Sequence, residues 1–311
     1  MAETPFNTAF FPEPGIPEEL APGLRRLVAP NASAMTFRGT NTYLLGEAEI
    51  AVIDPGPDDP AHYDAILRTV GRAGRISHVL VTHSHVDHSP LAARLARAAD
   101  APVLALGDSF SQRSELMARL AARFDLGGGE GVDAGFRPDR RLADGEVVHG
   151  GEWQLEALAT PGHFSNHLCF AWPGEQAVFS GDHVMGWATT LVSPPDGDLT
   201  AFMASLARMA ARGDDRCYFP GHGAELADPL GMVAYLADHR RNRESQILAA
   251  LDDGDATPLA LAQRIYTEIP VELIPAAARN VFAHLVDLVE RNRAEAVDDL
   301  SPTTAFRLIG R

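Results

Sequence analysis

The sequence predicts an α/β protein built from two sheets with helices on their outer faces, followed by a smaller, mainly helical domain. From Thr42 onward, short apolar runs typical of strands alternate with amphipathic helical patterns. Beyond Pro229 the pattern changes to three helical stretches and one pair of short apolar segments. We therefore expect a first domain over residues 1–230 and a second over residues 231–311.

The first predicted feature is an irregular arm over residues 1–30, which are rich in Pro and Gly. A hairpin, a helix and a buried strand should follow, at Tyr43–Leu45, Ile50–Ile53, Asp58–Val70 and Ile76–Val81. Ser89 then occupies the place of an N-cap and Pro90 that of a first helical residue. The apolar stripe of the helix that they open is expected to be Leu91, Leu95 and Ala98.

The middle of the chain should add an outer helix and the second sheet. A strand is expected at Val103–Leu106 and a helix at Ser111–Phe124. The glycines of Gly127–Gly131 predict a surface loop rather than a phosphate cradle, because no helix start or Lys-Ser/Thr follows them. The remaining strands and one helix are expected at Glu146–Val148, Trp153–Leu158, His167–Trp172, Ala177–Phe179, Leu199–Ala211 and Cys217–Phe219.

The second domain should begin with a long helix, Gly231–Leu251, and continue with a helix capped by Thr257 and another at Pro275–Arg291. Segments around Ala296 and Ala305–Ile309 can pair as a hairpin, and three helices with a hairpin resemble a winged-helix module. Acids outnumber arginines in residues 236–311, whereas a winged helix that binds nucleic acid should carry a basic stripe. We therefore expect this domain to pack on the first one, form a lid or mediate dimerisation.

Composition limits the class of protein. The 311 residues carry 42 acids against 26 arginines and no lysine, a net charge of −16, which excludes a lysine nucleophile and disfavours non-specific nucleic-acid binding. No apolar run approaches the ~20 residues of a membrane helix, so no membrane partner is expected. The N-terminus lacks a basic stretch before an apolar core, and Cys169 and Cys217 lie in apolar strands. Together these features predict a cytoplasmic protein with buried thiols.

The residues with most chemistry are Thr82-His83-Ser84-His85-Val86-Asp87-His88, which directly follow an apolar strand. The chain has only 12 histidines, and three of them fall in this run. Side chains two residues apart on an extended segment point to the same side, so His83 and His85 can share one metal ion. Asp87 and His88 follow at the turn into the next helix and can face a second ion.

A dinuclear site needs further ligands, and three Gly turns that follow strands supply candidates. These are His163 in Thr160-Pro161-Gly162-His163, Asp182 in Ser180-Gly181-Asp182, and His222 in Pro220-Gly221-His222. Ligands converge where strands end at one edge of a pair of sheets. His167, at the start of a strand, is expected to support a ligand or make a core hydrogen bond rather than bind metal.

These motifs, in this order over residues 35–225, resemble the metallo-β-lactamase superfamily. The resemblance implies an αβ/βα sandwich. It also implies one metal ion bound by His83, His85 and His163, a second bound by Asp87, His88 and His222, and Asp182 bridging both. Asp54, in Ile53-Asp54-Pro55-Gly56, would be a structural hydrogen-bonding acid and not a ligand.

Two segments, Thr36–Leu44 and His239–Leu248, are similar to segments of the lactamase-β-2-like branch, whose members carry a C-terminal winged-helix-like domain. That branch includes an endoribonuclease that acts on single-stranded RNA, and related domains are thioesterases in polyketide synthesis. This chain differs at Ser89-Pro90, where the branch usually has Ser-Gly-Gly, and Leu126–Pro138 resembles an insertion. For Arg240, Arg241 and Arg243, ion pairs with the acidic surface are expected in preference to phosphate binding.

The expected reaction is hydrolysis of a small ester, thioester or related acyl substrate. Two metal ions ~3.5–4 Å apart can hold a shared hydroxide, because coordination lowers the pKa of water from ~15.7 towards ~7. Asp87 would bind one ion and orient that hydroxide. Catalysis should depend most on Asp87 and His85. The ligand types favour two zinc ions, although manganese or iron can also bind such ligands. Asn41 and Trp187 are candidates for contact with substrate, and a turn-stabilising role is the alternative for Asn41.

Other functions are weighed against this one. Cleavage of single-stranded RNA is the first alternative, and the net charge of −16 favours a small-molecule substrate over it. Persulfide oxidation at a single iron is the second, and it would leave the second-metal positions unused. A flavodiiron site is disfavoured because that pattern has Glu where this chain has His85. A non-catalytic binding module is disfavoured by the complete ligand set. The protein could also form a homodimer.

Overall fold

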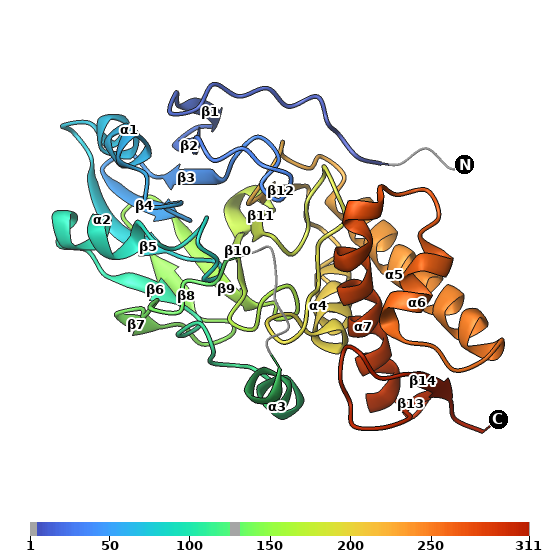
Figure 1. Ribbon diagram of the computed structural model, residues 1–311. Helices are drawn as coiled ribbons and strands as arrows, with labels where there is room; N and C mark the ends of the chain where they lie inside the picture. Colours follow the sequence, from blue (N-terminus) through green and yellow to red (C-terminus); the bar gives the residue numbers. More distant parts are fainter. Residues whose placement is uncertain (1–4, 125–130, 311) are drawn as a thin grey trace.

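The computed structural model describes residues 5–124 and 131–310, and it confirms the predicted α/β architecture (Figure 1). Two sheets face each other across an apolar core. Helices α1 (Pro60–Val70) and α2 (Ala92–Ala99) cover the outside of the first sheet. Helices α4 (Leu199–Ala210) and α5 (Pro229–Asp252) cover the outside of the second. This arrangement is the αβ/βα sandwich that the sequence motifs imply.

The first sheet contains seven strands in chain order: β1 (Glu18–Ala21), β2 (Leu24–Val28), β3 (Asn41–Leu45), β4 (Glu49–Ile53), β5 (Arg75–Leu80), β6 (Val103–Ala105) and β7 (Arg140–Arg141). Strands β1 to β4 pair in antiparallel fashion, and β4 to β7 pair in parallel. The sequence pattern does not predict β7, because two exposed arginines at a sheet edge carry no apolar signal.

The prediction of an irregular arm over residues 1–30 is wrong from Glu18 onward. Pro22 and Gly23 form a turn, with Gly23 at a φ of 73°, and this turn pairs β1 with β2. Leu24 packs between the two sheets and Leu27 packs under the outer helices, and both are fully buried. The Pro-Gly dipeptide therefore marks a hairpin turn here and not an unstructured stretch.

The second sheet has the order β12 (Cys217–Pro220), β11 (Ala177–Gly181), β10 (Leu168–Trp172), β9 (Gln154–Ala159) and β8 (Val147–His149). Strands β11 and β12 are parallel, and the other neighbours are antiparallel. A short 3₁₀ turn, η1 (Pro173–Glu175), joins β10 to β11. Large side chains from both sheets fill the space between them, among them Tyr43, Leu155, Phe170, Phe179 and Phe219. Burying these side chains supplies the main stabilisation of the sandwich, at about 1.5–3 kcal/mol for each.

Helix α2 begins later than the sequence predicts. Its cap position is Leu91 and not Ser89, and its first residue is Ala92. The Ser89 hydroxyl is used elsewhere, because it donates to Asp133 Oδ2 at 2.8 Å and to the His85 carbonyl at 3.3 Å. Ala98 is exposed, whereas Leu91 and Leu95 are buried as expected. The Ser-Pro signal for a helix start is overridden by tertiary hydrogen bonds beside the histidine run.

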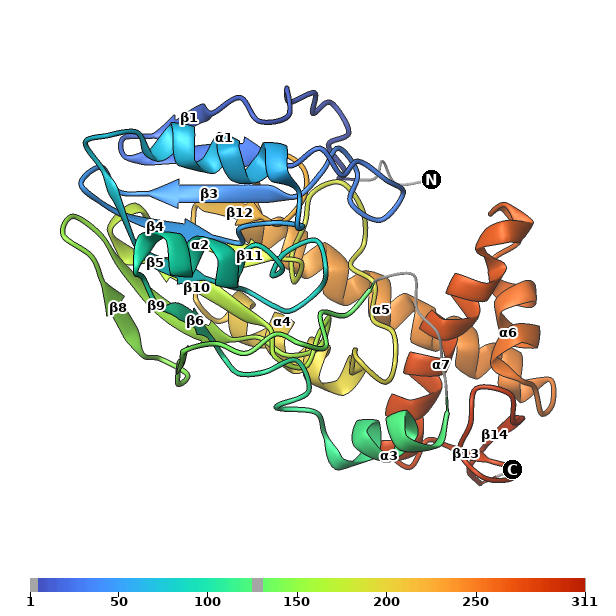
Figure 2. The same ribbon diagram turned by 60° about the vertical axis from the view of Figure 1, so that its left-hand side comes forward.

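The C-terminal domain contains α5, α6 (Pro258–Ile265), a 3₁₀ turn η2 (Val271–Leu273), α7 (Ile274–Glu290) and the hairpin β13–β14 (Ala294–Ala296, Phe306–Leu308). Thr257 caps α6 as predicted. Figure 2 shows α7 standing between α6 and the sandwich. Helix α3 (Glu115–Arg123) reaches over from the first domain, and its Met117 and Leu120 join the core of the second. The domain therefore packs on the sandwich. Among the described residues, none of the helices combines the length and apolar character that a membrane crossing requires.

Candidate metal centre

Seven predicted ligands meet at one end of the sandwich, where strands of both sheets end. The run His83–His88 follows β5, and the loops after β9, β11 and β12 supply the other three residues. Their donor atoms form three overlapping groups within 4.8 Å: His83, His85 and His163; His83, His88 and Asp182; Asp87, His88 and His222. Side chains that lie up to about 140 positions apart in the sequence thus share one polar cluster, because each follows a strand that ends at the same edge.

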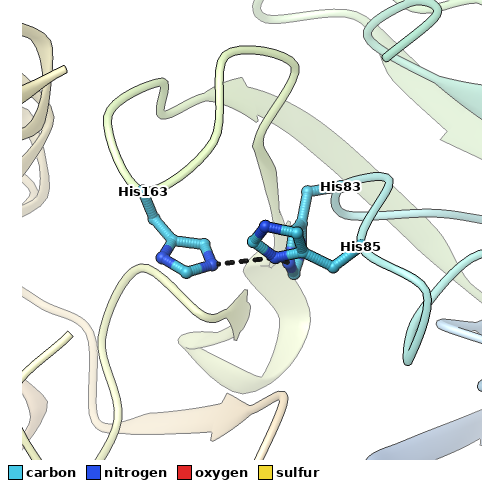
Figure 3. Close-up of side chains that lie close together, drawn as sticks. All are labelled: His83, His85 and His163. Atoms are coloured by element: carbon cyan, nitrogen blue, oxygen red, sulfur yellow. Dashed lines mark hydrogen bonds between the residues drawn. The ribbon is translucent and has the colours of Figure 1, made fainter. Parts of the chain in front are cut away.

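The first group is a triad of imidazoles (Figure 3). Nε2 of His83 lies 2.8 Å from Nδ1 of His85, and Nε2 of His163 lies 3.2 Å from the same atom. Burial, with the nearby His163, lowers the pKa of His85 to about 3, and burial also holds the pKa of His83 well below its usual range. Both rings are therefore neutral at pH 7, which is the form of histidine that binds metal ions.

The group of Asp87, His88 and His222 adds a carboxylate to the imidazoles. Nε2 of His222 lies 3.2 Å from Oδ2 of Asp87, and Nε2 of His88 lies 3.4 Å from the same oxygen. Burial acts against ionisation of Asp87, but the charges and hydrogen bonds of His88 and His222 hold its pKa well below the usual range. The Asp87 carboxyl is therefore ionised, and although burial opposes the charged imidazoles, the carboxylates of Asp87 and Asp182 raise the pKa of His88 well above its usual range and that of His222 to about 10.

Asp182 lies between the imidazole triad and the group of Asp87, His88 and His222. Its carboxylate is 3.3 Å from Nε2 of His222, 3.5 Å from Nε2 of His88 and 3.7 Å from Nε2 of His163. It is the acid that approaches histidines of both groups. Its central place corresponds to the bridging position that the sequence motifs imply.

The cluster has the properties of a cation site. Nε2 of His88 and Oδ1 of Asp182 are buried, lie 3.5 Å from each other and make no hydrogen bond among the described residues. Buried polar atoms without partners are uncommon in folded proteins, and a bound cation would satisfy both of these atoms. The 2.8–3.2 Å separations in the imidazole triad are near the ~3.4 Å edge of a tetrahedron with ~2.1 Å bonds. Imidazole nitrogens with carboxylate oxygens suit zinc, and manganese or iron can also bind them.

Polar contacts on the side away from the centre of the cluster orient its histidines. In three of them the second ring nitrogen faces a polar atom: Nδ1 of His163 donates to the Leu191 carbonyl at 2.8 Å, and Nδ1 of His222 to the Gly39 carbonyl at 3.1 Å. Nδ1 of His88 lies 3.0 Å from Oδ2 of Asp54. Such contacts fix which ring nitrogen carries the proton and orient the other nitrogen toward the centre of the cluster.

Asp54 is the most connected of these supports. Its carboxylate accepts the Thr82 N–H and the Thr82 hydroxyl, both at 2.7 Å, besides its contact with His88. It is buried and has a positive φ of 50°. Asp54 thus ties the end of β4 to the start of the histidine run, and it does not belong to any of the three groups of donor atoms.

Asp54→Ala is expected to lower the free energy of unfolding by about 3 kcal/mol, because it leaves three buried donors without an acceptor. Denaturant unfolding followed by circular dichroism would measure the change. Asp58→Ala is the matched control, since Asp58 lies four residues on and its side chain is 73% exposed. Equal stability of the two variants would contradict this role of Asp54.

The other predicted site residues lie around the cluster. Nε2 of His167 accepts the Asp182 N–H at 3.2 Å, and its Nδ1 meets the Thr160 hydroxyl, so it supports the Asp182 turn. Asn41 is fully buried and donates to the carbonyls of Pro220 and Gly223, on either side of His222. Trp187 lies in the wall of the cavity above the cluster.

Two supporting residues are not predicted as supports of the cluster by the sequence pattern. Asn166 binds Ser84, between the first two histidines, and also donates to the Gly107 carbonyl. The Thr40 hydroxyl donates to Oδ2 of Asp87 at 3.4 Å. Nothing in the spacing of either residue points to the metal cluster. Asn166 stands beside His167, and Thr40 lies in the segment Thr36–Leu44, which is similar to the lactamase-β-2-like branch.

The cluster forms the floor of a cavity of roughly 380 Å³. Most of its wall is apolar, with Met35, Val86, Met185, Trp187 and Leu191 among the lining residues. Ala276 of α7 also lines it, so the second domain contributes to the cavity. Trp187 is stacked on Phe37, with ring centroids 5.0 Å apart. No arginine is among the described residues that line the cavity. Of the predicted glycine loop, Gly131 lines the mouth, and Gly127–Gly129 lie outside the described residues.

Comparisons with known proteins agree with this geometry. The family model for the metallo-beta-lactamase superfamily matches residues 35–222, and that for the beta-lactamase associated winged helix domain matches residues 257–303. The beta-lactamase-like protein 2 homolog of Drosophila melanogaster is 32% identical over 280 residues, which are 86% of this chain and 88% of that protein. An atrochrysone carboxyl ACP thioesterase of Aspergillus fumigatus is 30% identical over 280 residues, covering 84% of this chain and 79% of that protein.

A solved structure shows the same fold over nearly the whole chain. A beta-lactamase domain protein from Burkholderia ambifaria matches with a TM-score of 0.79 and 22% identity, covering 97% of this chain and 96% of that one. The sandwich and the C-terminal domain are thus found together in another protein. The chain therefore belongs to the metallo-β-lactamase superfamily of hydrolases and carries the winged helix domain associated with it.

Proposed function

We propose that this protein hydrolyses a small ester or thioester with an apolar acyl group, using two divalent metal ions, zinc in the first instance. The observation that carries the proposal is the cluster of seven predicted ligands beside an apolar cavity, with five of the seven in its lining. The first ion would be held by His83, His85 and His163, and the second by Asp87, His88 and His222. Asp182 would contact both ions.

Bound metal ions would supply a water molecule activated at neutral pH and a Lewis acid for the carbonyl oxygen. The protein's own part is to place the groups around that chemistry. The Asp87 side chain is 20% exposed and lines the cavity, whereas the His88 and His222 side chains beside it are almost fully buried. Its carboxylate therefore faces the place where substrate and water meet, and it can orient the attacking water.

The cavity wall favours an apolar acyl group. Met35, Met185 and Leu191 offer aliphatic surface, and the Trp187 ring, backed by Phe37, offers a flat one. An acyl chain that enters this space loses contact with water, which stabilises the complex by about 0.8 kcal/mol for each methylene. The thioesterase name of the Aspergillus fumigatus relative is consistent with such a substrate.

Two features favour an acyl substrate over RNA. A phosphodiester brings charge into the site, and proteins usually bind it with arginine or lysine, which the described lining of the cavity lacks. Winged-helix proteins commonly read nucleic acid with a helix that is free on one face. Helix α7 is instead enclosed: Val281 and Leu285 face the core of the second domain, and Ala283 joins the core of the sandwich.

The test is a substrate panel with zinc-loaded protein, containing p-nitrophenyl esters and acyl thioesters of increasing chain length and a labelled single-stranded RNA. We expect hydrolysis of esters or thioesters, with kcat/KM rising roughly fourfold for each added methylene until the cavity is filled. Asp87→Asn should lower this activity about 10³-fold, and the exposed Asp58→Asn should leave it unchanged. Cleavage of RNA that Asp87→Asn abolishes, without any acyl hydrolysis, would favour the ribonuclease instead.

The cytoplasm is the proposed setting of this activity. Cys169 and Cys217 are free thiols in the structure, and a reducing compartment would keep them so. Cell fractionation is the direct check on this location.

A further inference from the structure

Arg240, on helix α5, is a buried cation without a buried anion. Its side chain is almost fully inaccessible, and no carboxylate pairs with it in the described part of the chain. The expected ion pair with the acidic surface is therefore not formed. Its guanidinium instead donates to Oδ1 of Asn280 at 2.5 Å and to the Thr190 carbonyl, and it lies 5.4 Å from the centre of the Phe202 ring.

The neighbouring arginines behave differently. Arg241 pairs with Asp238 on the surface, and Arg243 contacts Gln246 and the face of Tyr266. Arg240 alone among the three turns into the interface between the domains. Burial lowers its pKa to about 10, a sign that the charged form is held at a cost. The contacts of Arg240 connect it to the metal cluster by two routes.

The first connection is through the loop after β11. Thr190, whose carbonyl Arg240 binds, directly precedes Leu191, whose carbonyl accepts Nδ1 of His163 at 2.8 Å. Leu191 also lines the cavity. The guanidinium thus holds the peptide next to the one that orients the imidazole of His163.

The second connection is through Phe202 of α4. The Phe202 backbone packs against Gly162 so closely that a Cβ on Gly162 would lie 2.3 Å from the Phe202 Cα. Gly162 has a φ of 142° and is the residue before His163. Its carbonyl accepts the Asp198 N–H at 2.8 Å, at the start of the same helix. Arg240 therefore faces the helix against which the His163 turn rests.

We propose that Arg240 is a positioning residue for His163, and through it for the metal position of the three imidazoles. The C-terminal domain is then part of the metal centre and not only a neighbour of the cavity. The inference rests on the proposed function in one respect, since it takes His163 to be a metal ligand. It makes no assumption about the substrate.

The experiment measures zinc binding to the metal-free protein by competition with a chromophoric chelator. Arg240→Met keeps much of the volume and removes the donors, and we expect it to weaken one of the two zinc sites by 10- to 100-fold and leave the other within about threefold. Arg240→Lys should recover part of the loss. Arg243→Met, one turn along the same helix and without contact to the loop, should bind zinc as the original chain does.

Hydrolysis and folding are followed in the same variants. Where Arg240→Met does not fold, Asn280→Ala carries the test, because it loosens the guanidinium and keeps the charge; a threefold to tenfold weaker site is then expected. Two zinc sites of unchanged affinity in Arg240→Met, or equal losses in Arg243→Met, would overturn the proposal. An original chain that binds two zinc ions but hydrolyses no acyl substrate would overturn the proposed function and leave this inference standing.

Discussion

Asp182→Ala is expected to reduce the bound metal from two ions to one or fewer and to lower acyl hydrolysis by about 10³-fold or more. Asp182 approaches His88, His163 and His222 from the centre of the cluster, so its loss affects both proposed metal positions. Each tenfold loss of rate corresponds to about 1.36 kcal/mol of transition-state stabilisation, and removing a shared ligand should cost several times that. Elemental analysis and steady-state kinetics would measure the two effects.

Asp215→Ala is the control for this experiment. Asp182 and Asp215 are both 6% exposed, and Asp215 is bound by Arg212 and Tyr218 away from the cluster. Its removal should lower the free energy of unfolding without changing the metal content. If Asp182→Ala kept two ions and ordinary activity, the dinuclear centre proposed for this chain would be wrong.

Removal of metal by a chelator is expected to abolish hydrolysis and lower the Tm by about 10 °C. A ligand present at 1,000 times its Kd stabilises the folded state by about 4 kcal/mol, and each kcal/mol is worth about 2–4 °C in a chain of more than 150 residues. The Tm should fall because Nε2 of His88 and Oδ1 of Asp182 then stay buried without a hydrogen bond to any of the described residues.

Calorimetry before and after dialysis would give the Tm, and elemental analysis would give the ions per chain. Chelator already saturated with zinc serves as the control and should leave the protein unchanged. Added zinc should restore both activity and Tm. A single iron per chain and no zinc would count against the hydrolase and for the persulfide dioxygenase.

Most of the sandwich could be predicted because local chemistry marks its elements. The hairpin of β3 and β4 turns at Gly46, Asp59 caps α1 through its own side chain, and β10 and β11 are short apolar runs. These signals act within a few residues of each other. The N-terminal hairpin and the start of α2 were mispredicted, since burial of Leu24 and the bonds of Ser89 to Asp133 and His85 come from distant parts of the fold.

The sequence by itself determined which side chains are candidate ligands, because the histidine run is contiguous and the later candidates stand in glycine turns. Gly181, before Asp182, has a φ of 49°, and a Cβ there would meet Nε2 of His167 at 2.7 Å, so the turn needs glycine. Only the tertiary structure decided which atoms orient those ligands and what surrounds the substrate. The carbonyl of Leu191 and the side chains of Asn166 and Arg240 act across domain and strand boundaries. A backbone carbonyl is present at every residue, so no sequence pattern shows which one a folded chain will place behind a histidine.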